Sequence, residues 1–291
     1  MQTEFRRIAA LRGLMMRGDP RALPDFGRAA AAGWIARHAP ALPEGVSVTP
    51  LAEGPGRVFT PAGAEPGAAL VFIHGGGLVY YDSAVFTPFL AGLSARLGRV
   101  IIAPDYPKAP ETPAPQIASH LRSTLARLRA ARPGWRFQLA GDSVGGLLAL
   151  QMALDWAAEG AGAEALHLIY PVAGRSTDPA DPHGQGHFLD TTMMDWFQGF
   201  IAPLIPDAAP VDLPCARLSA LPPSTVHLAE CDILAPAASR LADRLAQAGR
   251  LRAAVTHHGL PHDFCLFEGA SPGARAAVGR ITGLMAAGCP A

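Results

Sequence analysis

Five short apolar runs that alternate with helical patterns restrict the fold of this chain most. The runs are ALVFIH, RVIIAPDY, FQLAGD, ALHLIYPV and STVHLAE, and helical spacing of apolar residues covers 117–131, 144–158 and 236–248. Strands that are apolar at successive positions are buried on both faces, and strands separated by helices form parallel sheets. The sequence therefore predicts an α/β fold with a mainly parallel central sheet flanked by helices.

Two segments depart from this alternation. Residues 3–38 place apolar and basic residues at helical spacing, and the segment before STVHLAE contains the apolar helical stretch TTMMDWFQGFIAPLI. Between 40 and 67, VSVTPL and GRVFTP predict a short antiparallel pair of strands. We expect N-terminal cap helices over 1–45, a core over 46–172 and 224–291, and a cap insert over 173–223.

The charge balance excludes several classes of partner. The 291 residues include 24 basic and 24 acidic side chains with no block of like charge, so neither a nucleic acid nor an anionic membrane is predicted as a partner. No apolar stretch is long enough to cross a bilayer, and the first residues lack the pattern of a secretory signal. A soluble cytoplasmic protein is expected, and a homo-oligomer is left open.

Metal and redox chemistry find little support in the sequence. The chain has four cysteines, Cys215, Cys231, Cys265 and Cys289. They lie far apart and form no CxxC pair, so free and mostly buried thiols are expected. His183 and His187 share a loop with Asp178 and Asp181, but without the spacing of a metal site. We predict no metal and no cofactor.

A polar turn, GDSVG at 141–145, joins the third apolar run to the helical pattern that follows it. Loops at the carboxyl ends of parallel strands line the ligand crevice. A Gly-x-Ser-x-Gly turn there holds its serine out of the core at a helix N-terminus, where developing negative charge is favoured. We predict that Ser143 is a nucleophile. The alternative is a helix-capping hydroxyl in an ordinary turn.

A serine nucleophile needs a histidine base and a carboxylate that orients the base. Asp232 follows the run STVHLAE, and His262 follows the next strand-like run, LRAAVTHHG, so both lie where strands are predicted to end. Of the competing carboxylates, Glu230 lies earlier in its strand, and Asp263 is expected to point away from the adjacent histidine. His257 and His258 are expected to be packing or surface residues.

Three consecutive glycines, Gly75 to Gly77, follow the first apolar run directly after His74. Without side chains their amides are unshielded, so the N–H groups can converge on an oxyanion. The alternative is a flexible turn. His74 is expected to position this loop and not to act as a base.

Motifs along most of the chain resemble the bacterial hormone-sensitive-lipase-like esterases of the α/β-hydrolase superfamily. They are HGGG at 74–77, DYPKAPE at 105–111, GDSVGG at 141–146, ECDIL at 230–234 and GLPHDF at 259–264. The resemblance implies an α/β-hydrolase fold with an eight-stranded sheet, covered by a helical cap that the N-terminal segment and the insert build.

The resemblance also implies roles for single residues. Ser143 would be the nucleophile, His262 the base and Asp232 the acid that orients it. The amides of Gly76, Gly77 and Val144 would form the oxyanion hole. Glu111, which closes DYPKAPE, resembles the structural glutamate of the family.

The expected activity is that of a serine carboxylesterase, which hydrolyses short- to medium-chain esters through an acyl-enzyme intermediate. An amidase or deacetylase would use the same groups and stays open as an alternative. A non-catalytic small-molecule receptor on this fold would be expected to lose the base, and His262 is present. The apolar pocket could be lined by Tyr80, Tyr81, Met193, Met194, Trp196, Phe197 and Phe200, although the last five also fit plain core packing.

Overall fold

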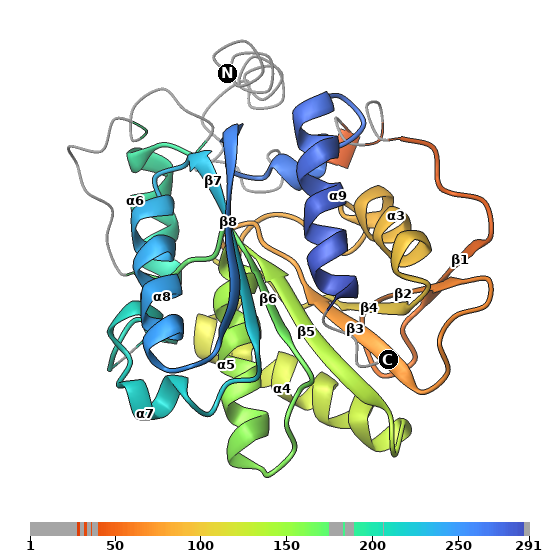
Figure 1. Cartoon of the computed structure of the whole chain (residues 1–291), viewed down its shortest axis with the longest axis horizontal. Helices are drawn as coiled ribbons and strands as arrows, with labels where there is room; N and C mark the ends of the chain where they lie inside the picture. The colour runs from red at the N-terminus through yellow and green to blue at the C-terminus, as the bar shows by residue number, and fades with distance from the viewer. Residues whose placement is uncertain are drawn as a thin grey trace.

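A mainly parallel sheet forms the centre of the molecule (Figure 1). The structure is a computed structural model that describes residues 28–29, 32–33, 36, 40–174, 183, 189–205 and 207–287. The described residues form an eight-stranded sheet in the order β1-β2-β4-β3-β5-β6-β7-β8. Its strands are β1 (Val46–Pro50), β2 (Gly56–Pro61), β3 (Ala68–Ile73), β4 (Val100–Pro104), β5 (Arg136–Asp142), β6 (Leu166–Ile169), β7 (Ser224–Cys231) and β8 (Leu251–Pro261).

The direction of the strands divides the sheet into two parts. Strand β1 pairs antiparallel with β2, and β2 pairs antiparallel with β4. From β4 through β3 to β8, each neighbouring pair is parallel. The predicted fold class, the antiparallel pair ahead of the core and the eight strands are thus confirmed.

Helices cover both faces of the sheet, α3 and α9 on one and α4, α5 and α8 on the other (Figure 1). The helices of the described residues are α3 (Thr87–Leu97), α4 (Ala114–Ala131), α5 (Val144–Ala158), α6 (Thr191–Ile201), α7 (Cys215–Leu218), α8 (Ala235–Gln247) and α9 (Pro272–Ala286). Side chains alternate across β3: Val71 and Ile73 join the cluster under α4 and α5, whereas Leu70 and Phe72 join the cluster under α3 and α9. Strand β3 therefore contributes to two cores.

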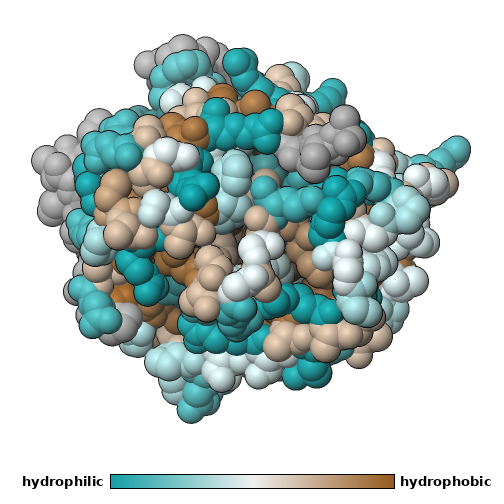
Figure 2. Space-filling model, turned by 60° about the horizontal axis from the view of Figure 1, so that its bottom comes forward, coloured by the Kyte–Doolittle hydropathy of each residue, from teal (hydrophilic) through white to brown (hydrophobic). Residues whose placement is uncertain are grey.

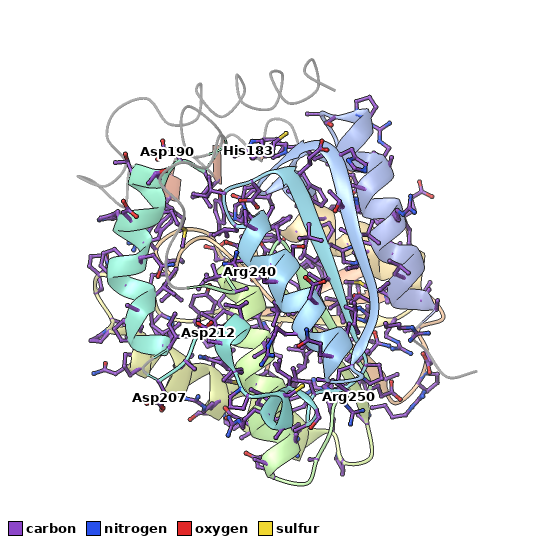
Figure 3. All side chains as sticks on the ribbon, turned by 60° about the vertical axis from the view of Figure 1, so that its left-hand side comes forward. His183, Asp190, Asp207, Asp212, Arg240 and Arg250 are labelled. Atoms are coloured by element: carbon purple, nitrogen blue, oxygen red, sulfur yellow. The ribbon has the colours of Figure 1, made fainter. Side chains whose placement is uncertain are left out.

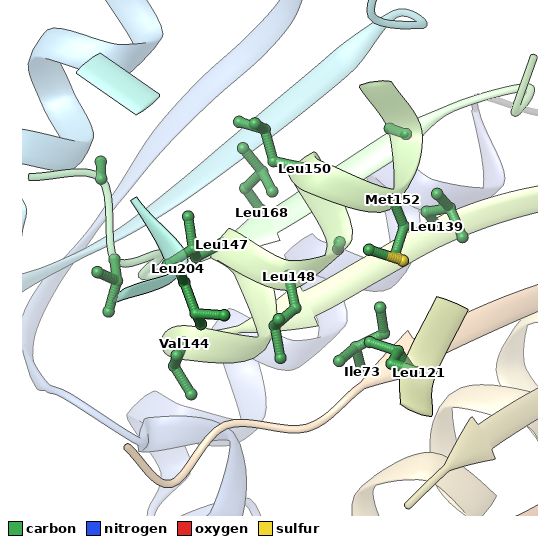
Figure 4. Packing of buried hydrophobic residues seen from close by; sticks show 14 of the residues in the cluster. Ile73, Leu121, Leu139, Val144, Leu147, Leu148, Leu150, Met152, Leu168 and Leu204 are labelled. Atoms are coloured by element: carbon green, nitrogen blue, oxygen red, sulfur yellow. The ribbon is translucent and has the colours of Figure 1, made fainter. Parts of the chain in front are cut away.

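Helix α5 packs against the sheet through buried apolar side chains (Figure 4). Most of its side chains are apolar and buried, and residues such as Leu147, Leu148 and Met152 pack between the sheet and the neighbouring elements, whereas Gln151 and Asp155 are only half-buried. A helix with so broad an apolar surface is stable only when that surface is covered. The burial of α5 fixes the position of its first turn, where the GDSVG motif lies.

The surface mixes polar and apolar residues, as the face in Figure 2 shows. Among the described residues, one large apolar side chain is exposed: Leu42, with half of its surface accessible. No helix in the described ranges combines the length and the apolar character needed to cross a lipid bilayer.

Three of the four cysteines lie in the described residues, and all three are free thiols. The expected burial is right for Cys265, but Cys215 is exposed and Cys231 is half-buried. Cys215 begins the short helix α7, where its side chain faces outward. Cys289 lies outside the described residues.

Candidate active site

The GDSVG turn connects β5 to α5 at the carboxyl end of the sheet. Ser143 stands between them with φ 53° and ψ −124°, a conformation that non-glycine residues rarely adopt. The flanking glycines are required because the backbones cross closely. A Cβ at Gly145 would collide with the carbonyl oxygen of Ile73, and a Cβ at Gly141 would collide with Gly145 itself. The sharp turn therefore holds the hydroxyl at the start of the buried helix.

The three predicted residues Ser143, Asp232 and His262 lie side by side. The Nε2 atom of His262 is 2.9 Å from Ser143 Oγ, and its Nδ1 atom is 2.6 Å from Asp232 Oδ2. The backbone amide of Leu234 donates to Asp232 Oδ1 at 2.9 Å, which fixes the carboxylate. The loops after β5, β7 and β8 supply the three side chains, and all three are buried. The arrangement can pass a proton from the hydroxyl to the imidazole.

The charge of the site favours a protonated imidazole. Burial alone would lower the pKa of His262, but the charges of Asp232 and then Asp263 outweigh it and raise that pKa to about 9. The ring of Tyr170 packs beside the imidazole, with centroids 4.8 Å apart. His262 is therefore a strong base held in a fixed orientation.

Asp263 does not point away from the histidine, so that expectation is wrong. Its Oδ1 atom lies 3.5 Å from His262 Nε2, and Tyr81 donates a hydrogen bond to its Oδ2 at 2.9 Å. With φ 59°, Asp263 is in the left-handed region, and the chain turns so that both side chains face the site. Sequence reasoning also missed Tyr81 in this role, because 182 positions separate it from Asp263.

The glycine loop lies next to the nucleophile. The backbone at Gly76 and Gly77 has φ 99° and 63°, and a Cβ at either would meet a neighbour too closely, the Tyr80 carbonyl or the Phe197 ring respectively. The Gly75 amide donates to Asp142 Oδ1 at 2.7 Å, which ties the loop to the GDSVG turn. Within the described residues, no acceptor bonds to the amides of Gly76, Gly77 or Val144. These amides remain available for a ligand oxygen.

The stacked rings of His74 and Tyr106 contact the backbone at the start of the glycine loop. The Nδ1 atom of His74 lies 2.9 Å from the Gly75 carbonyl oxygen, and its ring stacks on Tyr106 with centroids 4.1 Å apart. Tyr106 donates to the His74 carbonyl oxygen at 2.7 Å. Burial lowers the pKa of His74, which favours its neutral form. These contacts agree with the expected positioning role.

Arg28, in the N-terminal segment, holds the same loop from the other side. Its Nε donates to the Val79 carbonyl at 2.8 Å and its Nη2 donates to the Ala109 carbonyl at 2.8 Å. Its two Nη atoms also bond to the Glu111 carboxylate at 2.9 and 3.0 Å. The hydrogen bonds from Arg28 lower the pKa of Glu111 to about 2. Sequence reasoning did not find Arg28, because an arginine in a basic helical pattern gives no signal of its distant partners.

The other polar residues considered from the sequence lie outside the cluster of Ser143, Asp232 and His262. Glu230 accepts hydrogen bonds from the exposed His258 and from the Gly259 amide. His183 lies near the carboxyl ends of β7 and β8 (Figure 3). Among the described residues, no group of three or more histidine, cysteine or acidic side chains could hold a metal. His187, Asp178 and Asp181 lie outside the described residues.

A family model described as "alpha/beta hydrolase fold" matches residues 70–266. The chain is 31% identical over 227 residues to ethyl acetate hydrolase of Pseudomonas putida, and the match covers 72% of this chain and 71% of that protein. Bovine hormone-sensitive lipase is 36% identical over 98 residues, which cover 32% of this chain and 13% of the lipase.

Solved structures agree with these matches. A thermostable esterase from Pseudomonas putida superimposes with a TM-score of 0.86 at 26% identity, covering 98% of each chain. Because the family model covers about two thirds of the sequence and the match to the esterase is nearly complete, the predicted family is confirmed. The chain belongs to the alpha/beta hydrolase fold family, among its hormone-sensitive-lipase-like esterases.

Proposed function

We propose that this protein is a serine carboxylesterase whose nucleophile is Ser143. It is a carboxylic ester hydrolase by its relationship to ethyl acetate hydrolase and to the esterases of its fold. The observation that carries the residue assignment is the continuous contact from Ser143 Oγ through His262 to Asp232, at 2.9 and 2.6 Å. A buried contact of this kind activates a hydroxyl that is otherwise too weak a nucleophile.

The proposed reaction has two halves. Ser143 Oγ attacks the ester carbonyl while its proton passes to His262 Nε2, and the alcohol leaves with that proton. Water, deprotonated by the same imidazole, then releases the acid from the acyl-enzyme. The amides of Gly76, Gly77 and Val144 stabilise the oxyanion in both halves, and each such donor contributes about 3 kcal/mol to lowering the barrier.

Short acyl chains are the proposed substrates because aromatic side chains crowd the glycine loop. The ring of Phe197, from α6, packs so closely on Gly77 that a Cβ there would not fit. The ring centroid of Tyr80 lies 5.7 Å from that of Phe197, in an edge-on contact, and 6.1 Å from that of Trp196. These rings leave a long chain little room beside the loop. The acetyl group of ethyl acetate, the ester in the name of the Pseudomonas relative, is a short acyl chain of this kind.

We also propose that segments 1–45 and 173–223 form a cap over the core segments 46–172 and 224–291. Two contacts support it: Arg28 reaches the loop after β3, and Phe197 from α6 packs on Gly77. Both capping segments thus touch the glycine loop. The expected cytoplasmic location and the possible homo-oligomer stay predictions.

The direct test is covalent labelling with a fluorophosphonate, followed by turnover of p-nitrophenyl esters of increasing chain length. Wild-type protein should be labelled on Ser143, and Ser143→Ala should lose both labelling and turnover while its circular dichroism is unchanged. Ser47→Ala, at an exposed position on β1, is the matched control and should behave as wild type. Full turnover by Ser143→Ala would refute the assignment.

The chain-length panel tests the substrate class separately. Rates should be highest for acetate or butyrate esters, and Phe197→Ala should shift the optimum towards longer chains, since it removes the ring beside Gly77. An optimum that stays the same in Phe197→Ala would show that another surface limits chain length. Matched anilides, measured beside the esters, separate esterase from amidase activity.

A further inference from the structure

The active site contains a second carboxylate that the proposed mechanism does not use. Asp263 is buried, and its Oδ1 atom has no hydrogen-bond partner in the described part of the chain. That oxygen lies 3.5 Å from His262 Nε2, the nitrogen that also faces Ser143 Oγ. A buried carboxylate oxygen without a hydrogen-bond partner lowers the stability of the fold, which points to a functional role for this oxygen beside the reacting nitrogen.

The position of this carboxylate is fixed at both ends. Tyr81, which follows the glycine loop, donates to Asp263 Oδ2 at 2.9 Å, and this leaves Oδ1 towards the imidazole. Both residues have positive φ, 62° for Tyr81 and 59° for Asp263. Non-glycine residues adopt this region only at a local cost in backbone energy. Residues held in this way cluster at functional sites.

Resting on the proposed serine mechanism, we propose that Asp263, oriented by Tyr81, is a positioning residue for His262. It stabilises the imidazolium on the Nε2 side while Asp232 does so on the Nδ1 side. In the attack step the Ser143 O–H bond breaks, an O–C bond to the ester carbonyl forms, and the proton moves to Nε2, where it comes to lie beside Asp263 Oδ1. The same proton then passes to the leaving alkoxide oxygen as the C–O bond breaks.

A carboxylate beside His262 Nε2 affects catalysis in two opposite ways. A negative charge near Nε2 stabilises the proton in the transition state, but it also stabilises that proton in the free enzyme, where it blocks the base. The pKa of about 9 for His262 includes this effect. The charged and titratable groups that face the imidazole come from the carboxyl ends of four strands. They are Asp142 at the end of β5 and Ser143 after it, Tyr170 after β6, Asp232 after β7 and Asp263 after β8.

The test is the pH profile of kcat/KM for p-nitrophenyl acetate between pH 6 and 10. In wild type the rate should rise with pH through an inflection near pH 9, as His262 loses its proton, and approach its plateau above that pH. In Asp263→Asn the inflection should move down by about one pH unit or more, because a carboxylate within 4 Å shifts a neighbouring pKa by about 1–3 units. The alkaline plateau should fall by about three- to tenfold, because a weaker base accepts the proton less readily.

Damage to the fold alone would lower the whole profile and leave the inflection in place, and that result would overturn the proposal. Tyr81→Phe keeps the carboxylate but frees its Oδ2 atom, so its inflection should move in the same direction by a smaller amount. If circular dichroism shows that Asp263→Asn is unfolded, Tyr81→Phe decides, and an unmoved inflection again overturns the proposal. Asp155→Asn makes the same chemical change at the far end of α5 and should match wild type.

The fluorophosphonate reaction separates this proposal from the proposed function. If Ser143 is not the nucleophile, wild type will not be labelled at that residue at any pH. If Ser143 is the nucleophile but Asp263 has no influence, labelling will proceed in wild type and in Asp263→Asn with the same inflection.

Discussion

Buried histidines occur in two regions of this sheet, and they carry opposite pKa shifts. His262, at the carboxyl end of β8, has its pKa raised to about 9 despite burial, whereas His167 inside the sheet has its pKa lowered to about 3, chiefly by burial. His167 contacts Thr225 Oγ1 at 2.8 Å and Gln138 Oε1 at 3.3 Å, and both partners are neutral. His262 contacts a carboxylate on each side. Burial is common to both, so the neighbouring carboxylates decide the direction.

The backbone shows the same division. The described residues include five non-glycine positions with positive φ: Leu78, Tyr81, Ser143, Tyr170 and Asp263. All five follow the carboxyl ends of β3, β5, β6 or β8. None of these five positions lies within a strand, and the side chains of the central strands alternate between two cores. Unusual backbone and unusual charge therefore coincide at one end of the sheet, which is where function is expected in an open parallel sheet.

Among changes that leave the nucleophile in place, the largest effect is expected when the carboxylate beside His262 Nδ1 is removed. Asp232→Asn should make His262 resemble the histidines of the sheet interior, because an amide neither carries charge nor fixes the tautomer. We expect kcat on p-nitrophenyl acetate to fall by about 10³- to 10⁴-fold. Asp155→Asn, which breaks only an exposed ion pair with Arg122, should keep full activity. A loss of less than tenfold in Asp232→Asn would mean that burial alone orients the histidine.

A smaller loss is expected from crowding the glycine loop. Gly77→Ala places a Cβ in the Phe197 ring at a positive φ, so either α6 or the amide must move. The expected fall in kcat is about 10²-fold, the effect of losing one oxyanion donor. Gly279→Ala on α9 is the matched control, since a Cβ there meets nothing within 4 Å. That variant should keep its activity and gain about 0.5–1 kcal/mol in unfolding free energy.

These two regions also differ in how far the sequence could predict them. The strands, α5 and the order of Ser143, Asp232 and His262 follow from apolar periodicity and from motifs, because each signal is local. The Asp263 side chain was predicted wrongly because its direction depends on one left-handed backbone angle, which no residue pattern indicates. Tyr81 bonds to a residue 182 positions away, and Arg28 bonds to residues 51 to 83 positions away. Only the folded chain brings these residues together.

The opposite pKa shifts predict opposite effects of pH on stability. His167 has a folded pKa below its unfolded value of 6.5, so its contribution is complete above pH 6.5 and is lost as pH falls towards about 3. His262 has a raised folded pKa, so its contribution is complete below pH 6.5 and is lost as pH rises through about 9. Each histidine changes the free energy of unfolding by at most about 1.4 kcal/mol per pH unit.

Urea unfolding at a series of pH values checks both slopes. His167→Gln should flatten the loss of unfolding free energy between pH 6 and 4, and His262→Gln should flatten the loss between pH 7 and 9. If His167→Gln left the acid slope as it is in wild type, the other buried histidines with a lowered pKa would be the candidates. They are His74 and the neighbouring pair His227 and His257, in which Nδ1 of the first lies 3.2 Å from Nε2 of the second.

The smallest effect is expected at the cap. Arg28→Gln removes the donors to the Val79 and Ala109 carbonyls, and groups left without partners cost about 1–3 kcal/mol when buried. Because Val79 and Ala109 are buried, we expect the unfolding free energy to fall by about 1–3 kcal/mol. The less firmly held glycine loop should lower kcat by less than Gly77→Ala does, with little change in KM. Glu111→Gln keeps both carbonyl contacts and removes an exposed charge, so it should cost less than Arg28→Gln. Arg122→Gln, which breaks a surface pair, is the control. If Glu111→Gln reduced kcat more than Arg28→Gln, the charge of Glu111, and not the support of the two carbonyls, would be what holds the glycine loop in place.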